Sequence, residues 1–195
     1  MQINNSFEVP LPPADAWKVL MDIPRIAPCM PGAELTGVAG ENTYNGKVSV
    51  RLGPVALTFA GQVTFSDIDE INHKARVKAQ GKDAKGRGGA HANVDFHLEP
   101  SPLGSRVLVK TDLTLSGAVA QYGRASGMIQ DVAQQLIGQF ADRLKEQLAS
   151  SRTEAKSTVE KTQPQKQKAI SGFSLFFIAL ASAFRRLFGR KHDPA

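Results

Sequence analysis

The single cysteine, Cys29, is the first side chain in the sequence that could act as a nucleophile. A catalytic thiol needs a positioned histidine, a nearby cation or a helix N-terminus to lower its pKa. Cys29 instead lies between Pro28 and Met30 in a proline-rich turn, and no such partner is evident. We expect a small buried residue at the mouth of a pocket. One cysteine also excludes an internal disulfide and is typical of a reducing compartment.

Histidine and acidic residues alternate along one segment and could suggest a metal site. His91, Asp95, His97 and Glu99 occupy odd positions, between apolar residues at even positions. In a strand they would share the polar face, where neighbours lie roughly 6.6 Å apart. A compact metal site would therefore need ligands from another strand, and we expect a solvated face without metal.

The glycine-rich segment 81–89 could suggest a phosphate-binding loop. It lacks the P-loop spacing, and no strand-to-helix junction follows it. A mobile hairpin is the better interpretation, and its Lys82, Lys85 and Arg87 could serve a lid or a docking loop. The sequence also shows no catalytic triad order, no paired acidic residues in a plausible pocket and no cofactor fingerprint. We expect a protein that is not an enzyme.

The elements that would position these residues follow from the apolar spacing. A first strand begins near Ile3, and a short helix is predicted over residues 14–21 after a pair of prolines. From residue 33 to about residue 118 apolar and polar residues alternate, as in an antiparallel meander with one solvated face. Apolar residues then recur every three or four positions from Ile129 to Leu148, which predicts a long amphipathic helix.

These elements predict an α+β helix-grip fold over residues 1–149, with a curved antiparallel sheet that wraps the C-terminal helix. Glycines within the strands, Gly46, Gly61 and Gly81, would help the sheet to bend. The concave face could enclose an apolar ligand pocket, although a filled core would give the same pattern. The predicted lining comprises Trp17, Met21, Cys29, Met30, Val48, Val50, Phe59, Val63, Phe65, Val94, Phe96, Leu113, Met128, Ile129, Val132 and Leu136.

The charge is distributed unevenly. Residues 1–149 contain equal numbers of basic and acidic residues, so the whole net charge of +6 lies in residues 150–195. A nucleic-acid-binding domain would carry its basic patch on the folded body, and we therefore expect no nucleic-acid partner.

The C-terminal tail combines a polar linker, residues 150–169, with an apolar segment, residues 170–195, that has basic flanks. The uncharged run 170–184 is roughly 22 Å long as a helix, against about 30 Å of hydrocarbon. We predict a membrane-anchoring helix that lies in the plane of the bilayer, with a short tilted span or a docking helix for a partner protein as alternatives. Its membrane contacts would be Phe173, Phe176, Phe177, Leu180, Phe184, Arg185, Arg186 and Leu187.

Several motifs resemble the G-subunit family of carbon monoxide dehydrogenase, which belongs to the START-like (SRPBCC) superfamily. The most specific are the turn Cys29–Glu34 and the hairpin Val50–Val55; the segments 7–10, 59–63 and 113–117 continue the match to about residue 149. The resemblance implies an accessory protein of a molybdenum-containing CO dehydrogenase-type enzyme. It also implies a bound quinone, menaquinone or ubiquinone, and therefore favours a pocket over a filled core.

The resulting hypothesis is a membrane-tethered carrier that holds a respiratory quinone and links the dehydrogenase to the membrane electron-transport chain. The N-terminus has no secretory signal pattern, so we expect the cytoplasmic face of the bacterial inner membrane. The alternative is a recruitment factor that docks the dehydrogenase to membrane lipids without carrying a ligand. A cyclase or hydrolase of the same superfamily would need polar groups on the concave face, and the predicted lining supplies none.

Overall fold

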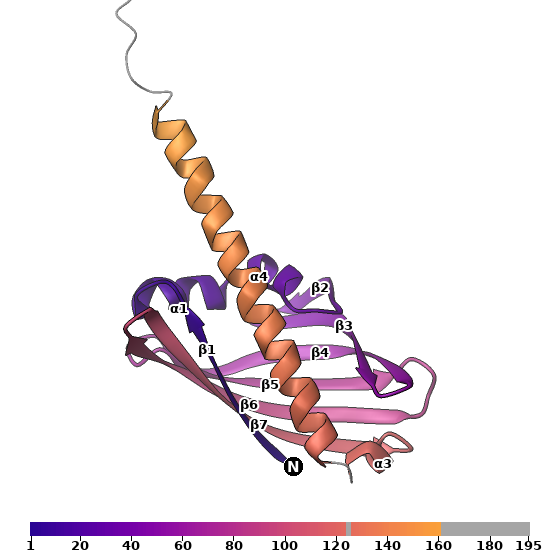
Figure 1. The fold of residues 1–195 in the computed structure, drawn as a ribbon. Helices are drawn as coiled ribbons and strands as arrows, with labels where there is room; N and C mark the ends of the chain where they lie inside the picture. Colours follow the sequence, from indigo (N-terminus) through magenta and orange to yellow (C-terminus); the bar gives the residue numbers. More distant parts are fainter. Residues whose placement is uncertain (124–125, 161–195) are drawn as a thin grey trace, which may run out of the picture. The chain divides into compact units, whose positions relative to one another are not determined.

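The computed structural model describes residues 1–123 and 126–160 (Figure 1). Residues Met1–Arg152 form one compact unit, which contains the whole sheet and most of the last helix. A second unit begins at Thr153. The strands are β1 (Gln2–Val9), β2 (Ala33–Gly40), β3 (Thr43–Leu52), β4 (Val55–Asp69), β5 (Lys74–Asp83), β6 (Gly88–Ser101) and β7 (Gly104–Gly117). The helices are α1 (Pro13–Met21), α2 (Ile23–Ile26), the 3₁₀ turn η1 (Ala27–Cys29), α3 (Ala120–Gly123) and α4 (Ser126–Glu160).

The seven strands form a single antiparallel sheet in the order β1-β7-β6-β5-β4-β3-β2. Six of them follow each other as a meander, and β1 returns to pair with β7. The predicted alternation is confirmed, because paired residues such as Phe59 and Val48 lie on the inner face while their neighbours lie outside. The predicted curved sheet with a C-terminal helix is therefore correct.

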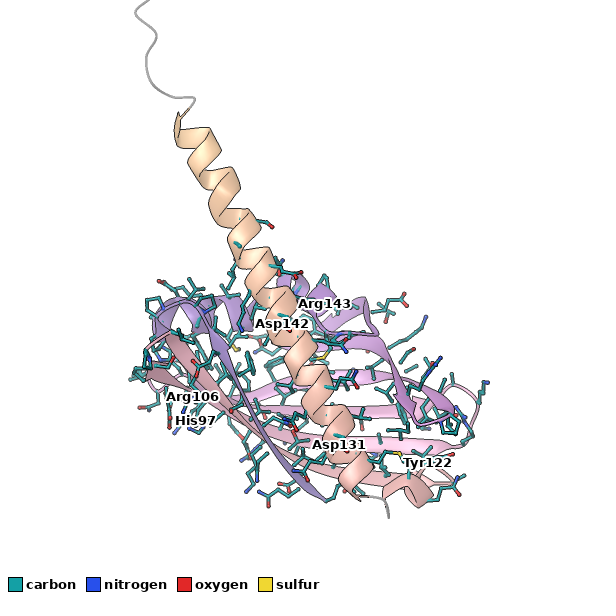
Figure 2. All side chains as sticks on the ribbon, viewed as in Figure 1. His97, Arg106, Tyr122, Asp131, Asp142 and Arg143 are labelled. Atoms are coloured by element: carbon teal, nitrogen blue, oxygen red, sulfur yellow. The ribbon has the colours of Figure 1, made fainter. Side chains whose placement is uncertain are left out.

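Helix α4 crosses the inner face of the sheet (Figure 1). Phe140, Leu144 and Leu148 recur at four-residue intervals and are buried against the sheet and α1. Asp131, Asp142 and Arg143, which are labelled in Figure 2, are exposed on other sides of α4. This amphipathic pattern explains why the helix packs with one face only.

The helix is longer than the predicted domain. It continues through the predicted boundary at residue 149 as far as Glu160, the last described residue, so the start of the predicted linker is helical. The remaining linker and the apolar tail, residues 161–195, lie outside the described residues. No helix within residues 1–123 and 126–160 is long and apolar enough to span a membrane.

The proline-rich turn between α1 and β2 depends on one glycine. Gly32 has a φ of +73°, which L side chains rarely adopt, and a Cβ atom there would overlap the carbonyl oxygen of Ser49. The Gly32 carbonyl also accepts a hydrogen bond of 2.9 Å from the Ser49 amide. Gly32 therefore fixes the turn that carries α2 and η1 against strand β3.

The buried interior consists of two separate clusters. The larger one joins α1, the middle of α4 and the ends of β1, β5, β6 and β7, around residues such as Val9, Val107 and Leu144. The smaller one joins the β3–β4 hairpin to the segment before α4, around Leu57 and Val119. The interior is thus not one continuous packed core.

The larger cluster should carry much of the stability. Leu144 is 1% exposed, and its truncation in Leu144→Ala removes buried apolar contacts and leaves a void. We expect the free energy of unfolding, measured by urea denaturation, to fall by about 2–5 kcal/mol. The matched control is Leu103→Ala, because Leu103 is 70% exposed and should change the same quantity by less than about 0.5 kcal/mol. Equal losses in both variants would contradict this assignment of the core.

Candidate functional site

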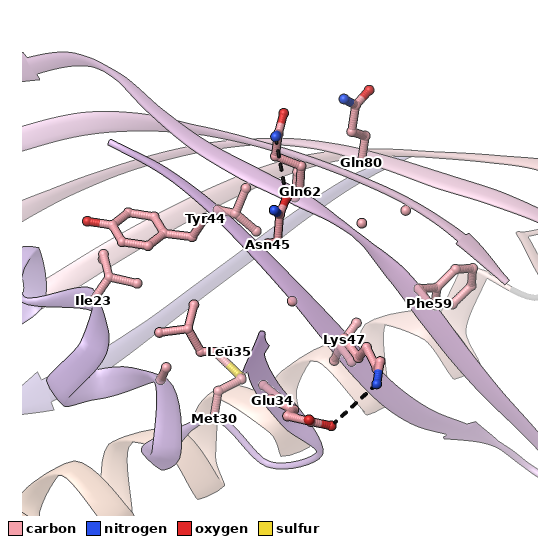
Figure 3. A pocket seen from close by; sticks show the side chains of 18 of the residues that line it. Ile23, Met30, Glu34, Leu35, Tyr44, Asn45, Lys47, Phe59, Gln62 and Gln80 are labelled. Carbon is pink, nitrogen blue, oxygen red and sulfur yellow. Dashed lines mark hydrogen bonds and ion pairs between the residues drawn. The ribbon is translucent and has the colours of Figure 1, made fainter. Parts of the chain in front are cut away.

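A cavity of about 440 Å³ adjoins both buried clusters, because Phe140 of the larger one and Phe59 of the smaller one are in its wall; Figure 3 gives a close view of it. Its walls come from the inner face of β2 to β6, from α2 and η1, and from Phe140 on α4. It is open to solvent on one side. Its volume lies within the range of roughly 300–1,000 Å³ that is typical of small-molecule sites.

The cavity exists because a row of the sheet carries almost no side chains. The register aligns Gly46 with Gly61, Gly61 with Gly81, and Gly81 with Ala90 across four neighbouring strands. The adjacent row adds Ala79 opposite Ala92. At these positions α4 faces backbone and methyl groups, so the space between sheet and helix stays empty.

The glycines are also needed for close packing within the sheet. A Cβ atom at Gly61 would overlap the carbonyl oxygen of Gln80 on the neighbouring strand, and one at Gly46 would lie 2.9 Å from the Glu34 carbonyl oxygen. The same residues therefore permit the bend of the sheet and leave its inner face bare.

The polar residues around the cavity contribute backbone atoms to its wall, whereas their side chains lie on the outer face of the sheet. Gln62 and Asn45 alternate with inward residues, and their side chains bind each other on the outer face at 3.4 Å (Figure 3). Glu34 and Lys47 form an ion pair of 3.9 Å on that same face. The interior is thus lined by aliphatic and aromatic groups.

Tyr44 is the exception to this separation. Its side chain shares the inner face, and its ring contacts that of Phe65 edge-on, with a centroid distance of 6.2 Å. In Figure 3 the phenol extends beside Ile23. Its hydroxyl forms no hydrogen bond with any of the described residues, so it could bind a polar group of a ligand at the rim.

Five residues of the predicted lining are in the cavity wall: Met30, Val48, Phe59, Val63 and Phe65. The others lie elsewhere. Trp17, Met21, Cys29 and Phe96 belong to the larger buried cluster, and Val50 and Val132 pack on the smaller one. Val94, Leu113 and Leu136 are half-buried outside the wall, Ile129 is buried, and Met128 is 42% exposed.

The predicted lining residues of α4 lie outside the cavity wall for a simple reason. The first turns of the helix pack over the β3–β4 hairpin, so the predicted lining residues of α4 are used for packing or remain exposed. The helix meets the cavity later, at Phe140. Periodicity identifies the inward face of a helix but does not show which turn lies over an empty part of the sheet.

The small residues that leave the cavity empty were not predicted from the sequence as part of the site. The small inner-face residues had a detectable signal, since Gly46, Gly61 and Gly81 each fall at an inward position of a strand. Besides the glycines and the polar residues Glu34, Asn45, Lys47, Gln62 and Gln80, the lining residues that were not predicted are Ile23, Ile26, Ala27, Ala33, Leu35, Tyr44, Ala79, Ala90, Ala92 and Phe140.

Cys29 is 4% exposed, and its thiol donates a hydrogen bond of 3.0 Å to Oε1 of Gln147. The Gln147 amide nitrogen in turn donates to the Arg25 carbonyl at 3.2 Å. Burial raises the pKa of the Cys29 thiol, although Arg143 and Arg25 partly oppose this effect. Such a thiol is not activated as a nucleophile; it connects the turn to α4.

The histidine segment lies on the outer face of the sheet, as predicted. His91 and His97 are exposed, and Nε2 of His97 lies 3.4 Å from Oε1 of Glu99. In the described part of the chain no group of three His, Cys, Asp or Glu residues is placed to hold a metal ion.

The glycine-rich hairpin differs from the predicted lid or docking loop, because one of its three basic side chains, Arg87, is already bound within the protein. Nε of Arg87 lies 2.7 Å from Oδ2 of Asp83, and its Nη2 donates to Oδ1 at 2.9 Å and to the Ala56 carbonyl at 2.9 Å. The Arg87 guanidinium is the main cause that holds the pKa of Asp83 well below its ordinary value. The hairpin is therefore anchored to β4, and Arg87 is not available for a partner.

A curved antiparallel sheet that wraps a C-terminal helix around an open apolar cavity defines a helix-grip protein. Solved structures agree with this fold. A conserved protein from Geobacillus kaustophilus matches with a TM-score of 0.66 and 23% identity, over 77% of this chain and 97% of that one. A protein from Thermus thermophilus matches with a TM-score of 0.56 and 14% identity, over 77% of this chain and 99% of that one. The ZhuI aromatase/cyclase from Streptomyces sp. R1128 matches with a TM-score of 0.53 and 14% identity, over 75% of this chain and 92% of that one.

The sequence itself is more specific than the fold. The family model of CoxG, the G subunit of carbon monoxide dehydrogenase, matches residues 6–149, and the chain belongs to this family. The resemblance identified from the motifs is thereby confirmed. No curated protein sequence matches the chain significantly.

The Asp83–Arg87 pair should make stability depend on pH. Because the folded-state pKa of Asp83 is lowered from 3.8, its contribution is complete above about pH 4 and declines as the pH falls below that value. Asp83→Asn should therefore destabilise the protein at pH 7, and this difference should shrink as urea denaturation is repeated down to pH 3. Asp112→Asn, on the exposed outer face, is the matched control. A difference that is constant over this range would contradict the role of the pair.

Proposed function

We propose that this protein is a membrane-tethered carrier that holds a respiratory quinone in the cavity and serves a molybdenum-containing CO dehydrogenase-type enzyme. In this role it links the enzyme to the membrane electron-transport chain from the cytoplasmic face of the bacterial inner membrane. The observation that carries the proposal is the open apolar cavity in a member of the CoxG family.

The cavity suits a flat apolar ring with a hydrocarbon chain. Phe59, Phe65 and Phe140 offer aromatic surface, and Gly61 and Gly81 let a ring approach the backbone closely. Transfer of apolar surface out of water contributes about 25 cal/mol per Å², so an uncharged ligand of this kind gains affinity from contact alone.

Tyr44 supplies the polar contact that a quinone needs. A quinone carbonyl is a hydrogen-bond acceptor, and the free Tyr44 hydroxyl is a donor at the rim of the cavity. The ring would thus be oriented with a carbonyl towards the mouth. A neutral hydrogen bond contributes about 0.5–1.5 kcal/mol, which orients a ligand more than it retains it.

The membrane anchor rests on the sequence of the tail. The segment 170–195 concentrates phenylalanine and leucine between basic flanks, and it follows a polar linker. Basic residues near anionic lipid each add about 1 kcal/mol to membrane binding. The linker would let the cavity-bearing unit move between bilayer and enzyme.

The direct test is to purify the full-length protein from membranes and to analyse an organic extract for quinone by mass spectrometry. Ala92→Leu should lower the amount of bound quinone about tenfold or more, because the added carbon atoms occupy the empty space. A tenfold loss of affinity corresponds to ~1.4 kcal/mol of binding free energy. The matched control is Ala60→Leu, which adds the same atoms on the exposed outer face of β4. Wild-type protein without quinone would contradict the carrier function.

The tail can be tested separately. A chain that ends at residue 169 should lose most of its partitioning into anionic liposomes in a flotation assay, because the apolar segment and its basic flanks are gone. Its unfolding midpoint and its quinone binding should be unchanged. Equal partitioning of the intact and shortened chains would contradict the anchor.

The same variants distinguish the recruitment factor from the carrier. A recruitment factor would keep the dehydrogenase on membranes in Ala92→Leu and release it only when the tail is removed. A carrier would lose electron transfer from the dehydrogenase to membrane quinone in both variants.

A further inference from the structure

Two apolar side chains on strand β2 are exposed although they lie on the inner face of the sheet. Leu35 pairs with Gly46 and is 36% exposed, whereas Val38 pairs with Tyr44 and is 67% exposed. Residues three apart normally point to opposite faces of a strand. A bulge between Leu35 and Gly37 shifts the register by one residue and brings both side chains to the same face.

Both side chains adjoin the mouth of the cavity. Leu35 is part of the cavity wall, and Tyr44, the cross-strand partner of Val38, is another part of it. In Figure 3 Leu35 lies below Tyr44 and Ile23 on this side of the cavity. The apolar wall of the cavity therefore adjoins two exposed apolar side chains of β2.

This edge of the sheet also lacks charged protection. Strand β2 is the last strand of the sheet, and residues 35–40 contain no charged side chain and no proline. Edge strands are generally protected by lysine, proline, an inward charge or a β-bulge. Strand β2 has bulges, which hinder pairing with another strand, but no charge on residues 35–40 that would repel an apolar surface. An exposed apolar edge of this kind is typical of a surface that meets an apolar partner.

We propose that the inner face of β2, with Leu35 and Val38, touches the bilayer surface and forms the passage by which a lipid-soluble ligand moves between membrane and cavity. The proposal rests on the proposed function, because it supplies the route for the same ligand. The chain of such a ligand would leave the cavity over Leu35 and Val38 without crossing water.

A lipid surface fits this edge better than a protein strand. Strand addition needs a regular row of free amide and carbonyl groups, and β2 is interrupted by register shifts between Leu35 and Gly37 and between Val38 and Gly40. Two exposed side chains are too few to hold the protein on a membrane, which fits a transient contact during transfer. Retention would be left to the tail.

The test measures transfer and affinity separately with the full-length chain. Transfer is the rate at which apo-protein takes ubiquinone-10 from phosphatidylcholine–phosphatidylglycerol liposomes. Affinity is measured with decylubiquinone in buffer, by quenching of the Trp17 fluorescence or by calorimetry. The variant is Val38→Asp, because Val38 is not part of the cavity wall. The matched control is Leu103→Asp, since Leu103 is 70% exposed but lies in the distant β6–β7 turn.

Val38→Asp should slow transfer roughly tenfold, because a charge replaces the apolar contact, and should leave the affinity for decylubiquinone unchanged. Val38→Trp should accelerate transfer, which a folding defect could not do. Wild-type transfer rates in Val38→Asp would overturn the proposal, as would an equal loss in Leu103→Asp. Normal transfer with lost binding to the dehydrogenase would also overturn it and identify β2 as a protein-docking edge. Wild-type protein that binds neither quinone would instead refute the proposed function.

Discussion

The structure depends on a part of the sheet where side chains are missing. Sheet and helix are held apart by two packed clusters, one at each end, and the separation is set by the large residues in those clusters. Between them Gly46, Gly61 and Gly81 cannot reach across to α4. Because the spacing is fixed at both ends, the middle cannot collapse, and an apolar space remains that water occupies only at a cost.

Most of the fold follows from the sequence, because it is encoded by local periodicity. The alternation over residues 33–118 and the spacing from Ile129 to Leu148 predict the sheet and α4 directly. The cavity does not follow in the same way. It depends on the cross-strand register that brings Gly61 opposite Gly81, and on the turn of α4 that meets the sheet there. Neither is a property of a single segment, so five predicted residues line the wall while others, such as Trp17, serve packing.

The two faces of the sheet divide the chemistry of the molecule. Outside, charged residues pair with each other, as Arg76 does with Asp95 and Asp67 at 2.7 and 2.9 Å. Inside, the acidic group in the sheet, Asp83, is neutralised by Arg87 at the end of a hairpin and away from the cavity wall. Among the described residues of the cavity wall, Glu34 and Lys47 pair with each other on the outer face, whereas Tyr44 places a hydroxyl on the inner face.

The hydrogen bonds around Gln147 have a mechanical consequence. One side-chain amide holds both the Cys29 thiol and the Arg25 carbonyl, and so attaches the α2–η1 segment to α4. That segment carries Ile23, Ile26 and Met30, which form one side of the cavity. A sliding or rotation of α4 along its axis must therefore drag this side with it or break both bonds. The position of α4 around Gln147 and the shape of this side of the cavity are therefore coupled.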